Sequence, residues 1–200
     1  MFIAHAGAAQ SAAQHPAARR NIGLFFDKLR TGKAVSVAYL GGSISQGVGA
    51  SDANKTSYRA LVNTWLHNRF PKARINELNA AVAGTGSIYG ALRARREVVE
   101  YKPDLVFLEF ATSDDGESED AVKKSIEGIV RQLLAVSQPP EIVLLYTTNA
   151  NRKAAVNWHE EIASFYHLPA LEPARIGLET TGNKQQHLRH AQQRRRKSER

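Results

Sequence analysis

Residues 41–45 form a glycine- and serine-rich turn whose residue types suit nucleophilic chemistry. The turn reads Gly-Gly-Ser-Ile-Ser, so two glycines allow a tight bend before Ser43, at a point where a helix could begin. Ser43 is therefore a candidate nucleophile, and its own backbone N–H could stabilise a developing oxyanion. A serine in this position also fits a simpler role, that of a helix cap.

Two further turns could supply partners for Ser43. Residues 79–87 contain Gly84, where the missing side chain would let a substrate approach a backbone N–H. Residues 111–116 contain Ser113, followed by Asp114 and Asp115, which we predict to be solvated loop or cap carboxylates. A dinucleotide-binding role for residues 84–90 is disfavoured, because the third glycine follows the second by four positions instead of three.

The elements that must position these turns alternate along the chain. Apolar or β-branched runs predict strands, and longer segments with apolar residues at helical spacing predict helices. The alternation predicts an α/β domain with a parallel sheet, in which ligands bind beyond the carboxyl ends of the strands. The run at 73–79 is more polar, which favours an edge, whereas those at 104–110 and 141–146 should be central. The expected strands cover residues 34–40, 73–79, 104–110, 141–146 and 168–171, and the expected helices residues 19–31, 58–66, 87–100, 126–134 and 152–166, with Ser87 and Asn151 available as caps.

Composition limits the chemistry that is available. The 200 residues include no cysteine, which excludes disulfides and thiolate catalysis, and a metal would need His and carboxylate ligands. No apolar run approaches the ~20 residues of a membrane-spanning helix. Of the net charge of +8, residues 175–200 contribute +6, from eight basic and two acidic side chains. We predict that this tail is disordered. We therefore expect it to bind nucleic acid only non-specifically.

The order of the three turns resembles the SGNH or GDSL-type esterases and acylhydrolases, over about residues 20–172. Residues 41–45 look like the first block of that family, residues 79–86 like its second, and residues 103–111 like the strand leading to its third. The resemblance implies a flavodoxin-like three-layer α/β/α sandwich and hydrolysis of acyl esters, often on carbohydrates or lipids, without a cofactor. It implies Ser43 as nucleophile, with oxyanion donors from the Ser43 and Gly84 amides and from Ser113.

Three features depart from the family pattern. Gly42 stands where the family most often has Asp, and Ser113 replaces the usual Asn, whose amide reaches further than a hydroxyl. The family's carboxyl-terminal Asp-x-x-His is absent, and only His187 and His190 lie late enough to replace its base. Loss of the base from a Ser–His pair costs ~10⁶ in kcat. The alternative to an impaired esterase is therefore an inactive SGNH-fold binding protein with a basic tail.

We divide the chain into an extension over residues 1–18, a hydrolase-like domain over 19–174 and the tail over 175–200. The extension is expected to be disordered and is a poor secretory signal, which favours a cytoplasmic location. The family-like pattern stops near Ala174, as truncation or a change of reading frame would cause. His159 and His167 are predicted to be structural, and His67 has no neighbours that would complete a metal site.

Overall fold

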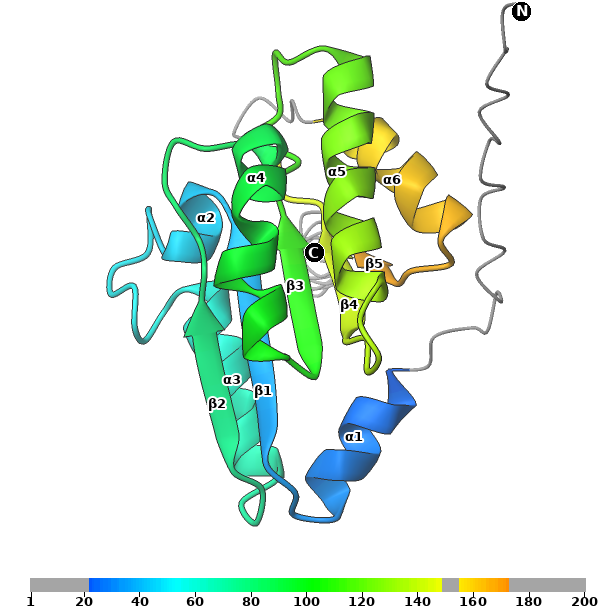
Figure 1. Ribbon diagram of the computed structural model, residues 1–200. Helices are drawn as coiled ribbons and strands as arrows, with labels where there is room; N and C mark the ends of the chain where they lie inside the picture. Colours follow the sequence, from blue (N-terminus) through cyan, green and yellow to red (C-terminus); the bar gives the residue numbers. More distant parts are fainter. Residues whose placement is uncertain (1–21, 149–154, 173–200) are drawn as a thin grey trace, which may run out of the picture.

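A single sheet of five parallel strands organises the chain in the computed structural model, which describes residues 22–148 and 155–172. The strand order is β2-β1-β3-β4-β5, and every neighbouring pair is parallel (Figure 1). This arrangement confirms the predicted α/β class and the flavodoxin-like sandwich. The strands are β1 (Val35–Gly41), β2 (Ile75–Asn79), β3 (Leu105–Glu109), β4 (Glu141–Leu145) and β5 (Ala170–Leu171).

Helices cover both faces of the sheet. Helices α1 (Gly23–Arg30) and α3 (Tyr58–Arg69) pack on one face, where Phe25 and Leu66 join side chains of the three central strands. The other face is covered by α4 (Ser87–Glu97), α5 (Glu119–Leu134) and α6 (Val156–Phe165). A four-residue helix, α2 (Ser43–Gln46), follows β1, and a 3₁₀ turn, η1 (Val99–Tyr101), precedes β3. Among the described residues, no helix is both long enough and apolar enough to cross a membrane.

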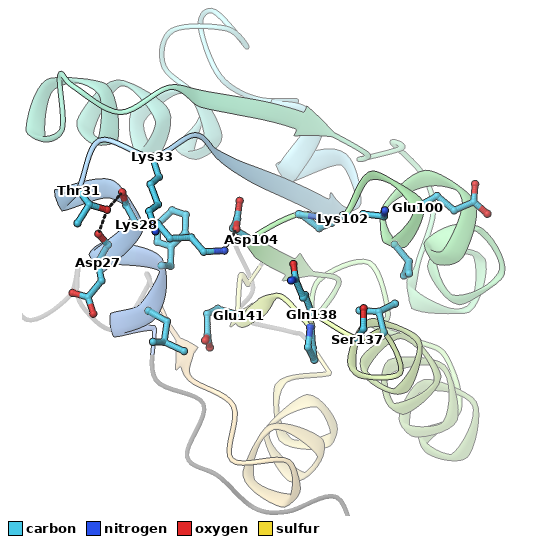
Figure 2. Close-up of a pocket in the computed structure, with 16 residues that line it drawn as sticks. Asp27, Lys28, Thr31, Lys33, Glu100, Lys102, Asp104, Ser137, Gln138 and Glu141 are labelled. Atoms are coloured by element: carbon cyan, nitrogen blue, oxygen red, sulfur yellow. Dashed lines mark hydrogen bonds and ion pairs between the residues drawn. The ribbon is translucent and has the colours of Figure 1, made fainter.

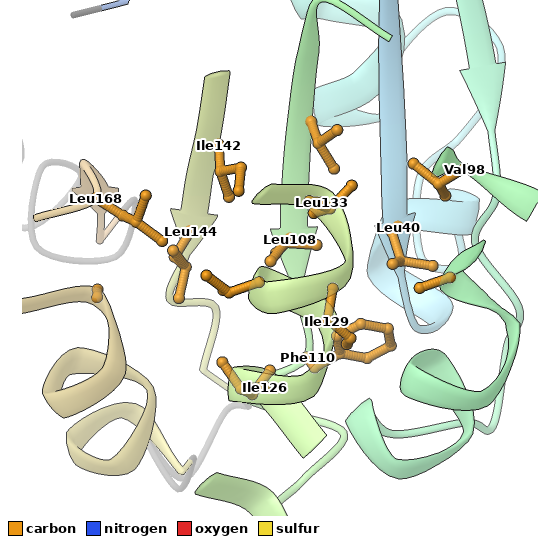
Figure 3. Close-up of a cluster of buried hydrophobic side chains, with 14 of the residues drawn as sticks. Leu40, Val98, Leu108, Phe110, Ile126, Ile129, Leu133, Ile142, Leu144 and Leu168 are labelled. Carbon is orange, nitrogen blue, oxygen red and sulfur yellow. The ribbon is translucent and has the colours of Figure 1, made fainter. Parts of the chain in front are cut away.

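The burial of each strand agrees with the polarity of its residues. All residues of β3 and β4 are buried, because helices cover both of their faces, and both strands lie inside the sheet as predicted. The polar β2 lies at an edge, with no fully buried residue. Alternate residues of the central strands supply the larger core cluster beneath α4, α5 and α6 (Figure 3), which includes Leu40, Leu108, Ile126, Leu133 and Leu144.

The start of α4 differs from expectation. We predicted Ser87 as its cap, but the cap position belongs to Gly86, and the Ser87 hydroxyl instead lies 2.6 Å from the Ser125 hydroxyl of α5. Further along α4, Gly90 packs so closely on Phe110 that a Cβ there would stand 2.6 Å from the ring. Gly90 thus allows close helix–sheet packing, which accounts for the third glycine without a nucleotide.

The termini are not described. The predicted extension and the whole of the predicted tail lie outside the described residues, as do Asn151, His187 and His190.

Candidate active site

The loops after β1, β2 and β3 meet at the carboxyl edge of the sheet, where α2 and the start of α4 lie (Figure 1). The Val82 N–H donates to the Gly41 carbonyl at 3.1 Å, and the Ala83 N–H donates to Oε1 of Gln46 at 2.9 Å. These bonds join the loop after β2 to the loop after β1. The sequence prediction that these turns share one edge agrees with this arrangement.

Ser43 is the first residue of α2 and is partly exposed. Gly42 precedes it in the cap position with an ordinary φ of −93°, and α2 has no side-chain cap. Among the described residues, the Ser43 hydroxyl has no hydrogen-bond partner, so the alternative role of a capping serine is not observed.

Gly84 and Ser113 lie in the two neighbouring loops. Gly84 has a φ of +73°, a conformation that favours glycine, and no atom lies within 4 Å of the place a Cβ would take. Ser113 is partly exposed, and its Oγ would stand 2.3 Å from a Cβ on Gly42. The structure thus brings the Ser113 hydroxyl against the turn that carries Ser43.

This contact links two of the departures from the family pattern. The same added Cβ on Gly42 would also lie 3.2 Å from the Thr85 carbonyl oxygen. Any side chain at position 42 would enter space that the Ser113 hydroxyl occupies, so Gly42 and Ser113 are complementary in size. The sequence alone treats them as separate changes, because the two positions lie far apart in the chain.

The buried carboxyl group of Glu109 is hydrogen-bonded to α2. Glu109, at the end of β3, accepts hydrogen bonds from the Ser45 N–H at 3.1 Å, the Ser45 hydroxyl at 2.9 Å and the Thr147 hydroxyl at 2.7 Å. The Tyr58 hydroxyl lies 2.6 Å from the Ser45 hydroxyl and extends the network to α3. Burial raises the pKa of Glu109 even though its hydrogen bonds oppose that shift.

The guanidinium of Arg93 ties the ends of β1 and β2 together. It is buried, and it donates to the carbonyl oxygens of Ala80 and Gly41, the latter at 3.3 Å. An ion pair with Glu97 balances its charge at 2.8 Å. Arg93 therefore fixes the position of the turn after β1 relative to the turn after β2.

Asp114 differs most from expectation. We predicted a solvated carboxylate, but Asp114 is fully buried, whereas Asp115 is exposed as predicted. One oxygen of Asp114 accepts from the Ser87 N–H at 2.7 Å, and the other lies 2.8 Å from Nε2 of His159. Burial is tolerated because both oxygens have partners. His159 was predicted to be structural and is itself only 1% exposed.

None of the histidines in the described part of the chain is hydrogen-bonded to Ser43. His159 faces Asp114, while His67 and His167 are exposed. His67 lies in the last turn of α3, and His167 precedes β5, so both lie toward the amino ends of the strands. Sequence reasoning missed the Asp114–His159 pair because 45 residues separate its members.

A groove of about 900 Å³ lies at the opposite edge of the sheet (Figure 2). It is lined in part by Lys28 of α1, which forms an ion pair with Asp104, and by Glu141 at the start of β4. Neither Ser43 nor Gly84 nor Ser113 belongs to its lining. The volume of this groove therefore does not identify the candidate site, which we place at the three loops on the carboxyl edge.

The parallel sheet and its strand order define the flavodoxin-like α/β/α sandwich class, with Ser43 at the carboxyl end of β1. The model of the GDSL-like lipase/acylhydrolase family matches residues 39–193, so the chain belongs to this family. The matched range extends beyond Ala174, where we placed the end of the domain. No curated protein was found to match the chain.

Solved structures agree with this assignment. A two-domain esterase active on acetylated mannans aligns with 76% of this chain at 32% identity and a TM-score of 0.71. The alignment covers 40% of that esterase, so this chain spans less than half of its length. AlinE4, an SGNH-hydrolase family esterase, has 24% identity and a TM-score of 0.57 over 69% of this chain and 75% of its own. An acetyl-xylooligosaccharide esterase from Geobacillus has 17% identity and the same TM-score and coverage. The last two comparisons show the fold.

Proposed function

We propose that this chain is a serine hydrolase of small acyl esters, with acetylated carbohydrates as its substrates. The observation that supports this proposal is the meeting of the three loops that carry Ser43, Gly84 and Ser113 at one sheet edge, with Ser43 partly exposed. The substrate class is supported by the similarity to an esterase active on acetylated mannans. Catalysis of this type needs no cofactor.

In the proposed reaction, the Ser43 oxygen attacks the ester carbonyl carbon. The carbonyl oxygen becomes an oxyanion, which would accept hydrogen bonds from the Ser43 and Gly84 N–H groups and the Ser113 hydroxyl. Collapse breaks the bond to the sugar oxygen, which leaves with the proton that the Ser43 hydroxyl lost in the attack. Water then attacks the acyl carbon, the bond to the Ser43 oxygen breaks, a proton of the water returns to that oxygen, and the carboxylic acid is released. Ser113 would be a weaker third donor than a longer amide side chain.

We propose further that turnover is slow. A serine hydroxyl needs a base, and within the described residues no imidazole reaches Ser43. Loss of one member of a Ser–His pair costs ~10⁶ in kcat. The turnover that depends on the Ser43 nucleophile should therefore be slow.

The test compares purified wild type with Ser43→Ala on a chromogenic acetyl ester and on acetylated manno-oligosaccharides. Ser51→Ala is the matched control, since Ser51 is an exposed loop serine. We expect Ser43→Ala to abolish enzyme-dependent turnover and Ser51→Ala to preserve it. Turnover that persists in Ser43→Ala would show that the nucleophile is assigned wrongly.

The second candidate function is an inactive SGNH-fold protein that binds acylated sugars. Within residues 22–148 and 155–172 no side chain is hydrogen-bonded to the Ser43 hydroxyl, which favours this function, because an active triad would contact that atom. Isothermal titration with acetylated manno-oligosaccharides separates the two functions. Binding without any Ser43-dependent turnover would favour the binding protein, and its basic tail would add a salt-sensitive affinity for polyanions that disappears when residues 184–200 are deleted.

A further inference from the structure

The carboxylate of Asp114 spans two of the loops that form the candidate site. Asp114 directly follows Ser113 in the loop after β3, and its Oδ1 accepts from the N–H of Ser87, the first residue of α4. Ser87 comes three residues after Gly84. One buried side chain, next to Ser113 in the chain, is therefore bonded to the start of α4, three residues after Gly84.

From these contacts we propose that Asp114 and His159 form a positioning pair, which holds Ser113 and Gly84 at the separation that the oxyanion requires. This inference rests on the proposed function. Neither side chain reaches the reacting atoms, because both are buried beneath the loops. Their role is to fix the donors before a substrate arrives, and donors act well only when they are held within about 0.5 Å of the productive geometry.

Close packing limits the freedom of the Asp114 carboxylate. A Cβ on Gly86 would stand 2.5 Å from its Oδ1 and 3.4 Å from the Ser113 carbonyl oxygen. Only glycine at position 86 lets the start of α4 approach this closely. A shift of Asp114 would therefore move Ser113 and the segment after Gly84 together.

His159 fixes the second oxygen of Asp114 from α6. Its Nε2 lies 2.8 Å from Oδ2, and its ring meets the Tyr146 ring edge-on at a centroid separation of 6.5 Å. The start of α6 is anchored to the same loop, because the Ala155 N–H donates to the Ala111 carbonyl at 2.8 Å.

Stability alone explains this pair poorly. Burial of two polar side chains carries a desolvation cost that their mutual hydrogen bond only partly offsets, and apolar residues of similar size frequently serve as well. A pair that is costly to bury, yet bonded to two elements of a candidate site, fits a requirement for exact orientation.

The test compares His159→Ala, His159→Gln and Asp114→Asn with two control variants. The control for His159 is His67→Gln on the exposed end of α3, and the control for Asp114 is the exposed neighbour, Asp115→Asn. Steady-state kinetics on the chromogenic acetyl ester give kcat and KM, thermal unfolding gives the folded fraction, and hydrogen exchange reports the Ser87 amide. His159→Gln retains an N–H donor and is the conservative variant if His159→Ala fails to fold.

We expect His159→Ala to lower kcat of the folded protein about 10- to 100-fold with KM nearly unchanged, because the lost alignment matters in the transition state. His159→Gln should restore most of that loss. Exchange of the Ser87 amide should accelerate in His159→Ala and Asp114→Asn but not in the controls. A kcat that stays at the wild-type value in His159→Ala would overturn the positioning role alone. If His159→Ala does not fold, a wild-type kcat in Asp114→Asn with unchanged Ser87 exchange would overturn it. Loss of the dependence on Ser43 would instead overturn the proposed function.

Discussion

Replacing Gly42 with alanine tests the contact between the first and third turns. The new Cβ would lie 2.3 Å from the Ser113 Oγ, whereas real Cβ contacts are at least 3.0 Å, so the hydroxyl must move by about 0.7 Å or rotate away. The backbone itself would not be strained, since φ at Gly42 is −93°. The substitution therefore acts mainly through the position of Ser113, with a second, less severe contact at 3.2 Å from the Thr85 carbonyl oxygen.

The expected effect is larger on the rate than on stability. A serine hydroxyl can turn to another rotamer, so we expect a loss of about 1 kcal/mol in the free energy of unfolding. That loss lowers the Tm by about 2–4 °C in a chain of this size. Removal of one oxyanion donor, by contrast, lowers kcat by ~10²–10³.

The double variant Gly42→Ala with Ser113→Ala makes this test selective. The Cβ of residue 113 lies 3.4 Å from the position of the new Cβ at residue 42, an acceptable contact, so removal of the hydroxyl should restore the Tm. The rate should stay as low as in Ser113→Ala alone, because both single changes remove the same donor. Gly128→Ala is the control, since nothing lies within 4 Å of its Cβ position in α5. An unchanged kcat in Gly42→Ala, or independent losses that multiply in the double variant, would refute this reasoning.

Three further substitutions test the elements that support the site. Because burial raises the pKa of Glu109 above 4.5, the folded state keeps a proton that the unfolded chain has released, and stability falls as pH rises between the two pKa values. Glu109→Gln should remove this dependence on pH. The Tm of the variant minus that of the wild type should therefore be larger at about pH 8 than at about pH 5. The same difference in Tm at both pH values would contradict the assignment. Arg93→Met removes the guanidinium that donates to the Ala80 and Gly41 carbonyls, and we expect a loss of about 1–3 kcal/mol in urea unfolding together with reduced turnover. Wild-type values for both would speak against the role of Arg93. Leu133→Ala in the core should cost about 2–5 kcal/mol yet leave kcat of the folded protein unchanged, which separates stability from catalysis; a parallel fall in kcat would show that core and site are coupled.

The strand order could be predicted in part from local sequence, because the apolar strands are the buried ones and the polar strand lies at an edge. The continuous apolar runs of β3 and β4 predicted central strands, and the polar β2 predicted an edge. The positions of Ser43, Gly84 and Ser113 at one edge followed from parallel topology, in which the carboxyl ends of strands meet. Their catalytic roles remain predictions.

The contacts that the sequence did not reveal join residues far apart in the chain. Asp114 follows a strand and precedes another acid, so it resembled a solvated cap, and only the packing of α6 brings His159 to it. Ser87 resembled a capping residue, but the Asp114 carboxylate takes over the N–H that a cap would satisfy. Local propensity cannot show which distant side chain will satisfy a backbone donor.

Covalent labelling tests the assignment of Ser43 most directly. An organophosphate ester that modifies nucleophilic serines is incubated with the full chain, and mass spectrometry of the digested protein locates the adduct. We predict an adduct on the peptide that carries Ser43, which is lost in Ser43→Ala and kept in Ser51→Ala. Ester hydrolysis by a protein labelled on another serine, or not labelled at all, would contradict the account.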